Sequence, residues 1–219
     1  MIDLAHRKGY PRTMFSGIIE SIEPILESRS ISHAHEITVK RPIFFDDIKI
    51  GDSIAVNGVC LTLESFTSEQ MKFTLGFETL KIIGSSFSQW LAYPVNLERS
   101  LAFGARVHGH FVTGHVESMV QILKSESFGD NWLITIQLDE VARKYCWKKG
   151  SITLNGVSLT INAAETGNIE VCLIPETQKR TNLNLFKVGE KLSFEPDSFA
   201  KAILEAVTHS NFFSGGKNV

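Results

Sequence analysis

The sequence predicts a mainly β protein made of two tandem, similar antiparallel barrels followed by a C-terminal α-helix. The stretch "SIAVNGVCLT" at residues 53–62 recurs as "SITLNGVSLT" at residues 151–160, with three differences in ten positions. Short runs rich in Val, Ile, Phe and Thr surround both copies and are separated by turn residues. Only the segment near the C-terminus shows sustained helical spacing of its apolar residues.

The repeat extends over most of the chain at a nearly constant shift. "FSGIIESIEPILES" at residues 15–28 matches "VTGHVESMVQILKS" 97 positions later, and the Glu-Thr pair at residues 78–79 recurs 98 positions later. This period is too long for a solenoid, so we infer two domains, residues 14–104 and 105–197, of about 90 residues each. Residues 1–13 form an N-terminal extension and residues 213–219 a tail.

Within each copy the local signals favour strands. "SIAVNGVCLTLESF" at residues 53–66 places apolar residues in near alternation around Asn-Gly, a dipeptide that tolerates the positive φ angles of a type I′ hairpin. "MKFTLGF" (71–77), "NWLITIQL" (131–138) and "IEVCLI" (169–174) predict further short strands. Several short strands bounded by turns predict a small barrel.

Helix signals are few. "DEVARKYCW" at residues 139–147 predicts two helical turns, and residues 198–212 predict a longer helix that Asp197 or Ser198 can cap. The apolar stripe of this helix consists of Phe199, Ile203, Leu204 and Val207. Such a stripe indicates either packing on its own domain or self-association, and the spacing alone favours neither.

Composition excludes several classes of function. The 219 residues carry a net charge of -2 and no Lys/Arg cluster longer than a pair, so no nucleic-acid partner is expected. No uncharged apolar run approaches 18 residues and residues 1–13 lack the apolar part of a signal peptide, so we expect a cytoplasmic protein without a membrane span. Three widely spaced cysteines are expected to be reduced thiols.

Five strings in order resemble the riboflavin synthase family, whose members contain a duplicated lumazine-binding repeat. They are "MFSGII" (14–19), "NGVCLT" (57–62), "GHFVTGH" (109–115), "NGVSLT" (155–160) and "IPETQKRTNL" (174–183). The resemblance covers residues 14 to about 207. It implies a six-stranded barrel in each half, a homotrimer, and a productive site between the N-terminal barrel of one subunit and the C-terminal barrel of another.

The resemblance also implies a reaction. Family members are transferases of riboflavin biosynthesis that move a four-carbon unit between two molecules of 6,7-dimethyl-8-ribityllumazine, releasing riboflavin and 5-amino-6-ribitylaminouracil. Neither a metal nor a redox cofactor is implied. Because the two reactants are identical, two similar pockets that hold them face to face suit the chemistry, and the duplication gains a chemical reason.

Three residues match the polar groups that lie nearest the reacting carbons in the family: Cys60, His115 and Ser158. Thr160 and Asp197 match supporting positions. Without the resemblance, a Cys in an alternating strand is more often a small buried hydrophobe, and Ser or Thr there is an ordinary strand hydroxyl. The change from Cys60 to Ser158 between the copies indicates a division of labour between a donor and an acceptor pocket.

The resemblance assigns substrate-binding positions to the two openings, the two hairpins, the later strands and one lysine beside the ribityl chain. These positions are Gly17, Ile18, Ile19, Gly114, His115 and Val116; Cys60, Leu61, Thr62, Val157, Ser158 and Leu159; Thr74, Leu75, Gly76, Phe77, Glu78 and Thr79; Cys172, Leu173, Ile174, Pro175, Glu176 and Thr177; and Lys149. A lysine beside another lysine is otherwise typical of a solvated turn.

The sequence departs from the family pattern in places. His108 stands where the family has glycine, and the first copy lacks the R-T-N-L that follows "ETQK" in the second, with Phe77 where a lysine is common. These last departures bear on the N-terminal pocket. If residues 108–115 form a strand, His108 and His110 share a face while His115 points away, which argues against a metal site.

Two other functions remain open. A non-catalytic relative, like the lumazine-binding antenna proteins of luminous bacteria, holds one chromophore without chemistry; retention of Cys60, His115 and Ser158 favours the enzyme. A generic oligonucleotide-binding barrel fits the short strands but not the acidic balance. The chain starts either at Met14 or with a disordered arm over residues 1–13.

Overall fold

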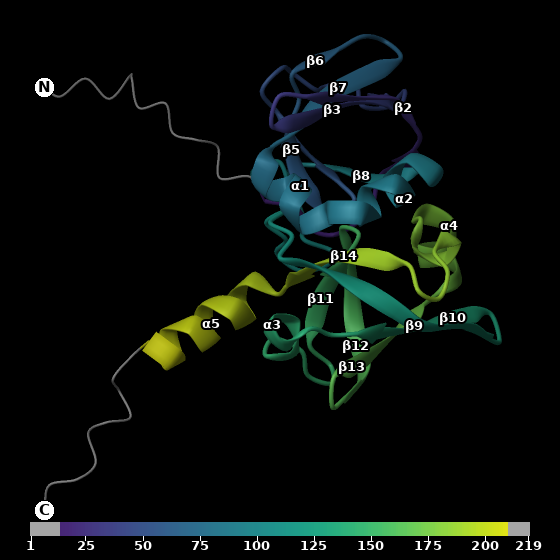
Figure 1. Ribbon diagram of the computed structural model, residues 1–219, viewed down its shortest axis with the longest axis vertical. Coiled ribbons are helices and arrows are strands. Elements are labelled where there is room, and N and C mark those ends of the chain that lie inside the picture. Colours follow the sequence, from purple (N-terminus) through teal and green to yellow (C-terminus); the bar gives the residue numbers. More distant parts are fainter. Residues whose placement is uncertain (1–13, 210–219) are drawn as a thin grey trace, which may run out of the picture.

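The computed structural model describes residues 14–209 and shows two β-rich halves stacked on each other, with the last helix projecting from the second half (Figure 1). The strands are β1 Ser21–Glu23, β2 Ile25–Ile31, β3 Ala34–Lys40, β4 Ser53–Val56, β5 Val59–Thr62, β6 Ser65–Phe66, β7 Gln70–Leu75, β8 Val95–Arg99, β9 Ser118–Phe128, β10 Asn131–Gln137, β11 Ser151–Leu154, β12 Val157–Glu165, β13 Asn168–Leu173 and β14 Lys191–Pro196. The helices are α1 Phe77–Ile83, α2 Phe87–Ala92, α3 Glu140–Arg143, α4 Pro175–Arg180 and α5 Ser198–His209, with 3₁₀ turns at Gly84–Ser86 and Leu183–Leu185. The predicted N-terminal arm and tail lie outside the described residues.

The second half is a closed barrel. Its strands follow the circular order β10-β13-β12-β11-β14-β9, and every neighbouring pair is antiparallel. Alternate residues point inward, so that Ile134, Ile136, Ile161, Val171 and Phe194 fill a core that is fully shielded from solvent. The predicted six-stranded antiparallel barrel is confirmed for this half.

The first half keeps the same circular order, but its ladders are interrupted. They form two four-stranded sheets, β1-β8-β4-β5 and β2-β3-β7-β6. One break lies at Pro24, between β1 and β2, where the residue has no N–H to donate to a ladder. The other lies at Leu63 and Glu64, between β5 and β6, where the second half has a bulge in the continuous β12. The prediction of a mainly β, duplicated fold is confirmed, with an opened barrel in this half.

The Asn-Gly dipeptides form the predicted type I′ turns. Asn57 and Gly58 have φ angles of 46° and 81°, and Asn155 and Gly156 have 45° and 81°. The two turns touch, because a Cβ added to Gly58 would lie only 2.6 Å from the backbone nitrogen of Gly156. The hairpins that carry Cys60 and Ser158 therefore meet tip to tip between the halves.

A buried amide network joins the halves around these turns. Asn182 donates from Nδ2 to Asn57 Oδ1 at 2.9 Å and from its backbone N–H to Asn96 Oδ1 at 2.8 Å. Asn96 in turn donates to the carbonyl oxygen of Asn155 at 2.8 Å, and Ser193 Oγ donates to that of Asn57 at 2.6 Å. These bonds connect residues of both copies and fix how the halves are oriented.

The helices depart most from the sequence prediction. Residues 139–147 form a single turn, α3, capped by the Asp139 side chain, rather than two helical turns. The short α1, α2 and α4 were not predicted, although Pro175 at the start of α4 is a recognised helix-start signal. Asp197 caps α5 by accepting from the N–H of Phe199 and Ala200. No helix among residues 14–209 is long and apolar enough to cross a membrane.

Candidate active site

Each half opens with a short extended segment that crosses to the other half. Ile19 packs in the hydrophobic core of the second half, and Val116 packs against the core of the first. Between them, Phe15 and Val112 form an antiparallel bridge with N–O distances of 2.7 and 3.0 Å. The crossing delivers residues 16–19 to the second half and residues 113–116 to the first.

The crossing segments end on Cys60 and Ser158, which occupy the same hairpin position in the two copies. The backbone N–H of Ser158 donates to the carbonyl oxygen of Gly17 at 2.8 Å, and that of Cys60 donates to Gly114 at 2.9 Å. Both glycines have positive φ, +73° and +77°, and a Cβ on either would lie 2.6 Å from the Cβ of its partner. Only glycine allows these contacts.

Two buried glutamates hold the crossing segments. Glu98 accepts hydrogen bonds from Ser16 N and Oγ at 2.7 and 2.8 Å and from Gly17 N at 3.0 Å. Glu195 repeats these three bonds on the second segment at 2.7, 2.8 and 3.0 Å. Burial raises the pKa of both carboxyls, and that of Glu98 reaches about 7 despite the hydrogen bonds, which act in the opposite direction.

A cavity of about 140 Å³ lies beside Cys60 in the first half. One wall is the hairpin with Cys60, a second is the crossing segment with His115, and a third is helix α1. The residues that line it are Val59, Cys60, Glu78, Thr79, Ile82, Ile83, Gly114, His115 and Val116. A half-buried thiol and an imidazole thus line one cavity, in which proton transfer and nucleophilic addition are possible.

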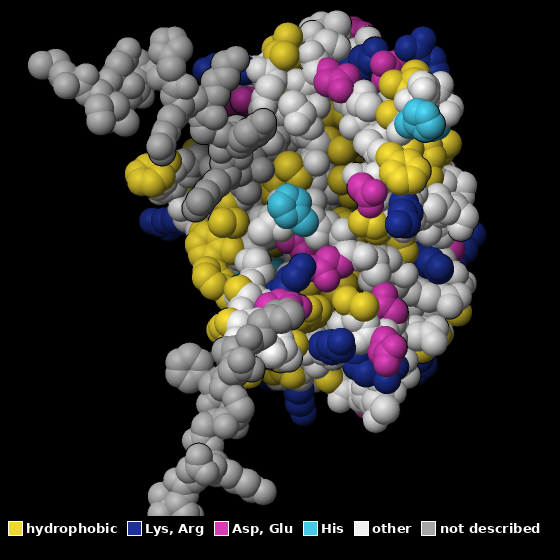
Figure 2. Space-filling model, turned by 60° about the vertical axis from the view of Figure 1, so that its left-hand side comes forward, with side chains coloured by type: hydrophobic (Ala, Val, Ile, Leu, Met, Phe, Trp, Pro, Cys, Tyr) yellow, Lys and Arg dark blue, Asp and Glu magenta, His cyan; other side chains and the backbone are white. Residues whose placement is uncertain are grey.

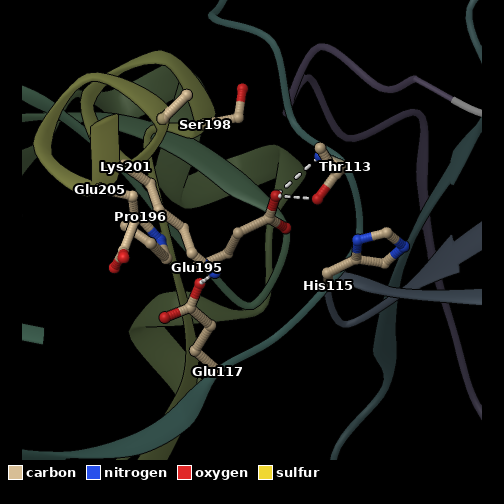
Figure 3. A pocket seen from close by; sticks show the side chains of 9 residues that line it. Thr113, His115, Glu117, Glu195, Pro196, Ser198, Lys201 and Glu205 are labelled. Carbon is tan, nitrogen blue, oxygen red and sulfur yellow. Dashed lines mark hydrogen bonds and ion pairs between the residues drawn. The ribbon is translucent and has the colours of Figure 1, made fainter. Parts of the chain in front are cut away.

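A larger cavity, of about 290 Å³, opens on the other side of His115 and reaches the first turns of α5 (Figure 3). It is rich in carboxylates: Glu195 bonds to Thr113, and Glu117 forms an ion pair with Lys201. A matching cavity of about 300 Å³ lies behind Glu98 in the first half. The two cavities are lined by equivalent positions of the two copies, so the duplication includes the cavities as well as the strands.

Ser158 has a histidine as its side-chain partner. Its Oγ lies 2.7 Å from Nδ1 of the half-buried His110, and Nε2 of the same ring lies 3.2 Å from Thr153 Oγ1. Desolvation lowers the pKa of His110, and Asp197 acts weakly in the other direction. The ring is therefore neutral near pH 7 and can accept a proton.

The comparisons with known proteins decide the family. The Lumazine binding domain matches twice, at residues 16–100 and 113–197. The riboflavin synthase of Bacillus subtilis (strain 168) is 35% identical over 198 residues, which cover 90% of this chain and 92% of that protein. The chain belongs to the riboflavin synthase family. The predicted family, enzyme class and riboflavin synthase function are confirmed by this match.

Further relatives agree with the riboflavin synthase assignment. The riboflavin synthase of Schizosaccharomyces pombe is 33% identical over 191 residues, covering 86% of this chain and 91% of that protein. Among solved structures, LumP complexed with riboflavin has a TM-score of 0.74 at 19% identity and covers 83% of this chain and 98% of that chain. LumP complexed with 6,7-dimethyl-8-(1'-D-ribityl) lumazine has a TM-score of 0.71 at 20% identity, covering the same shares. At this identity the likeness shows the fold alone.

Most riboflavin synthase positions assigned from the sequence fall into four structural groups. The cavity beside Cys60 collects Cys60, Glu78, Thr79, Gly114, His115 and Val116. Gly17 and Ser158 meet at the second crossing contact. Ile19, Leu61, Leu75, Val157, Leu159 and Leu173 are buried, and Thr74, Cys172 and Thr177 half-buried. Ile18, Thr62, Gly76, Phe77, Lys149, Thr160, Ile174, Pro175 and Glu176 are exposed.

Two details of the sequence interpretation need correction. Residues 77–79 and 175–177 lie at the starts of α1 and α4 rather than in strands. Residues 108–111 form a bend rather than a strand, so His108 is exposed, His110 contacts Ser158 and His115 lines the cavities. The predicted capping of α5 by Asp197 is confirmed.

Several residues of the site were missed by the sequence interpretation. His110 was considered only as a possible metal ligand, because nothing in its spacing points to a serine 48 positions away. Glu98 and Glu195 did carry a signal, since they coincide at the shift of 97 and a glutamate in an apolar strand needs a buried partner. The structure shows that role, since each glutamate binds the crossing segment of its own half.

Proposed function

We propose that this chain converts two molecules of 6,7-dimethyl-8-ribityllumazine into riboflavin and 5-amino-6-ribitylaminouracil by transfer of a four-carbon unit, with one molecule held by each kind of barrel. The observation that carries the proposal is the pair of crossing contacts, Gly114 on Cys60 and Gly17 on Ser158. They give both halves the same pocket wall with a different reactive side chain. Holding two identical reactants in fixed orientation contributes roughly 7–11 kcal/mol to lowering the barrier.

The reactive side chains suit the steps that this chemistry requires. A nucleophile must add at C7 of one lumazine, and a proton must leave the acidic C7 methyl group of the other. Cys60 and His115 share the cavity of the first half, and Ser158 occupies the equivalent hairpin position in the second. Thr160 and Asp197 are supporting positions, and no resident cofactor takes part in the proposed reaction.

The productive site is proposed to form between subunits of a homotrimer. Ser158 is not among the residues that line the cavity at Cys60, so the two reactive positions of one chain do not share that space. Helix α5 exposes Phe199, Ile203 and Val207 at 59%, 65% and 47% of their surfaces, which supports self-association. Figure 2, which brings the α5 side forward, shows apolar side chains gathered along one edge of this face. A cytoplasmic location stays a prediction.

One experiment tests the proposal. Purified protein is incubated with 6,7-dimethyl-8-ribityllumazine alone, without oxygen, metal or nicotinamide, and the appearance of riboflavin is followed by absorbance and chromatography. We expect riboflavin and the uracil product in equal amounts. Binding without product would indicate an antenna-type protein, and absence of binding would exclude both functions.

Variants of the two reactive positions refine the test. Cys60→Ser and Ser158→Ala are expected to lower turnover by different factors, because the two side chains serve different pockets. Turnover and lumazine affinity are measured for both under identical conditions. If neither change affects either quantity, the assignment of these residues is wrong.

A further inference from the structure

The ring of His110 is held between two hydroxyl groups of the second half. Nδ1 lies 2.7 Å from Ser158 Oγ and Nε2 lies 3.2 Å from Thr153 Oγ1. Thr153 is 1% exposed, so its hydroxyl is an anchor that cannot swing into solvent. The backbone N–H of His110 donates to the carbonyl oxygen of Ser16 at 3.2 Å, which ties the ring to the crossing segment.

The residue before His110 has to be glycine for this arrangement. A Cβ on Gly109 would lie 2.1 Å from the carbonyl oxygen of Ser16 and 2.8 Å from Ser158 Oγ. No side chain fits there without moving the backbone away from Ser158. The glycine at position 109 therefore allows residues 109–110 to approach the Ser158 hydroxyl closely.

The first half lacks both hydroxyls of this arrangement. Cys60 stands in place of Ser158, and Ala55 stands in place of Thr153 in the equivalent β4–β5 pair. An alanine cannot anchor an imidazole. Within residues 14–209, the duplicated frame therefore places a hydroxyl on each side of an imidazole at the serine position of the second half.

We propose that His110 is the base that serves Ser158, with Thr153 accepting from Nε2–H so that the lone pair of Nδ1 faces the serine hydroxyl. The proposal rests on the proposed function and adds a residue to it. In the forward step, Ser158 Oγ forms a bond to C7 of the lumazine in the second half, and its proton moves to Nδ1. The electron pair of the attacked C6=C7 bond moves through N5 toward the C4 carbonyl oxygen of the conjugated ring. When the C7–Oγ bond later breaks, His110 returns the proton, so no oxidant or reductant is consumed.

The electrostatic surroundings agree with this role. Burial lowers the pKa of His110, which keeps the ring neutral and its lone pair available near pH 7. Asp197, at the start of α5, is the charged group that acts on the ring, and it favours the protonated form once the proton has been taken up. An acid limb in turnover is therefore expected below pH 6.5, the ordinary value for histidine.

The test uses His110→Asn, with His108→Asn as a matched change on the exposed neighbour. Asparagine can keep a hydrogen bond to Ser158 but cannot take up its proton. We expect His110→Asn to lower kcat about 100-fold with little change in KM and to abolish the acid limb of the pH profile. The double variant with Ser158→Ala should be no slower than the slower single variant, and His108→Asn should resemble the wild type.

A second measurement does not depend on turnover. In protein with ¹⁵N-labelled histidine, the His110 ring should show an unprotonated Nδ1 and a protonated Nε2 at pH 7, and Ser158→Ala should shift its titration. A proton on Nδ1, or a fully active His110→Asn enzyme, would overturn the proposal. If the wild type does not convert lumazine, the proposed function fails, while the tautomer result still decides whether Nδ1 faces the serine as a base.

Discussion

Gly114 and Gly17 touch the two reactive positions, so one added methyl group tests the crossing contacts. A Cβ on Gly114 would lie 2.6 Å from Cys60 Cβ and 2.9 Å from its backbone nitrogen. A Cβ on Gly17 would meet Ser158 at 2.6 and 2.7 Å. Real Cβ atoms do not approach this closely, so Gly114→Ala or Gly17→Ala must push the segment away from the hairpin.

The size of the effect follows from what is lost. At φ near +75°, a Cβ alone costs about 1–2 kcal/mol. Displacement of residue 114 also breaks its bonds to Cys60 N–H, at 2.9 Å, and to Glu195, at 3.0 Å. Each buried group left unpaired costs about 1–3 kcal/mol, so Gly114→Ala should lower the free energy of unfolding by about 4 kcal/mol.

Gly51 provides the matched control. Its φ is +93°, nothing lies within 4 Å of an added Cβ, and the second half has Lys149 at φ 72° in the equivalent turn. Gly51→Ala should therefore cost only about 1 kcal/mol. Urea unfolding followed by tryptophan fluorescence measures both variants, and lumazine fluorescence measures binding. Equal unfolding midpoints for Gly114→Ala and Gly51→Ala would refute the reasoning.

Three further predictions concern stability and assembly. Burial raises the pKa of Glu98 from 4.5 to about 7, so the folded state retains a proton. The contribution of Glu98 to the free energy of unfolding should be complete below pH 4.5 and fall by roughly 3 kcal/mol as pH rises through 7, and denaturation at several pH values should show that Glu98→Gln removes this part of the slope. Asn182→Ala takes a donor from Asn57 and an acceptor from Asn155 Nδ2, so the free energy of unfolding in urea should fall by about 3 kcal/mol, and an unchanged value would contradict the role of the amide network. Ile203→Glu places a charge on the exposed face of α5 and should shift sedimentation toward the monomer; an unchanged oligomer would place the contact elsewhere.

The fold was largely predictable because the duplication repeats every strong local signal. Asn57-Gly58 and Asn155-Gly156 mark both hairpins through their positive φ angles, and one strand assignment could be transferred to the other copy. The broken ladder of the first half was harder to predict. Pro24 marks one break in the sequence. The other break, at Leu63 and Glu64, stands where the continuous β12 of the second copy has a bulge, and no local residue preference predicts that the strand ends here.

The site was predictable in its members but not in its connections. The family resemblance assigned Cys60 and His115 to positions near the same reacting carbons, and both side chains line one cavity. The bond between His110 and Ser158 joins residues 48 apart in sequence through a bend with no regular structure. A short polar segment of this kind has no periodicity from which a partner can be deduced, so only the three-dimensional structure reveals it.

The loss of R-T-N-L from the first copy gains a physical meaning from the structure. Asn182 of the second copy binds at the interface between the halves, and its counterpart in the first copy, Gly84, has no side chain to return the contact. Accordingly, Asn57 Nδ2 is buried without a partner among residues 14–209, whereas Asn155 Nδ2 reaches Asn182 Oδ1 at 3.4 Å.

The same loss changes the wall of the first pocket. Ile82 and Ile83 line the cavity at Cys60 in the places that Arg180 and Thr181 occupy in the second copy. An apolar wall weakens the binding of polar groups, whereas a hydroxyl paired with an imidazole gains from a polar surrounding. The two halves therefore differ in polarity as well as in the side chain at this hairpin position, and this asymmetry supports the proposal that two identical substrates take different roles.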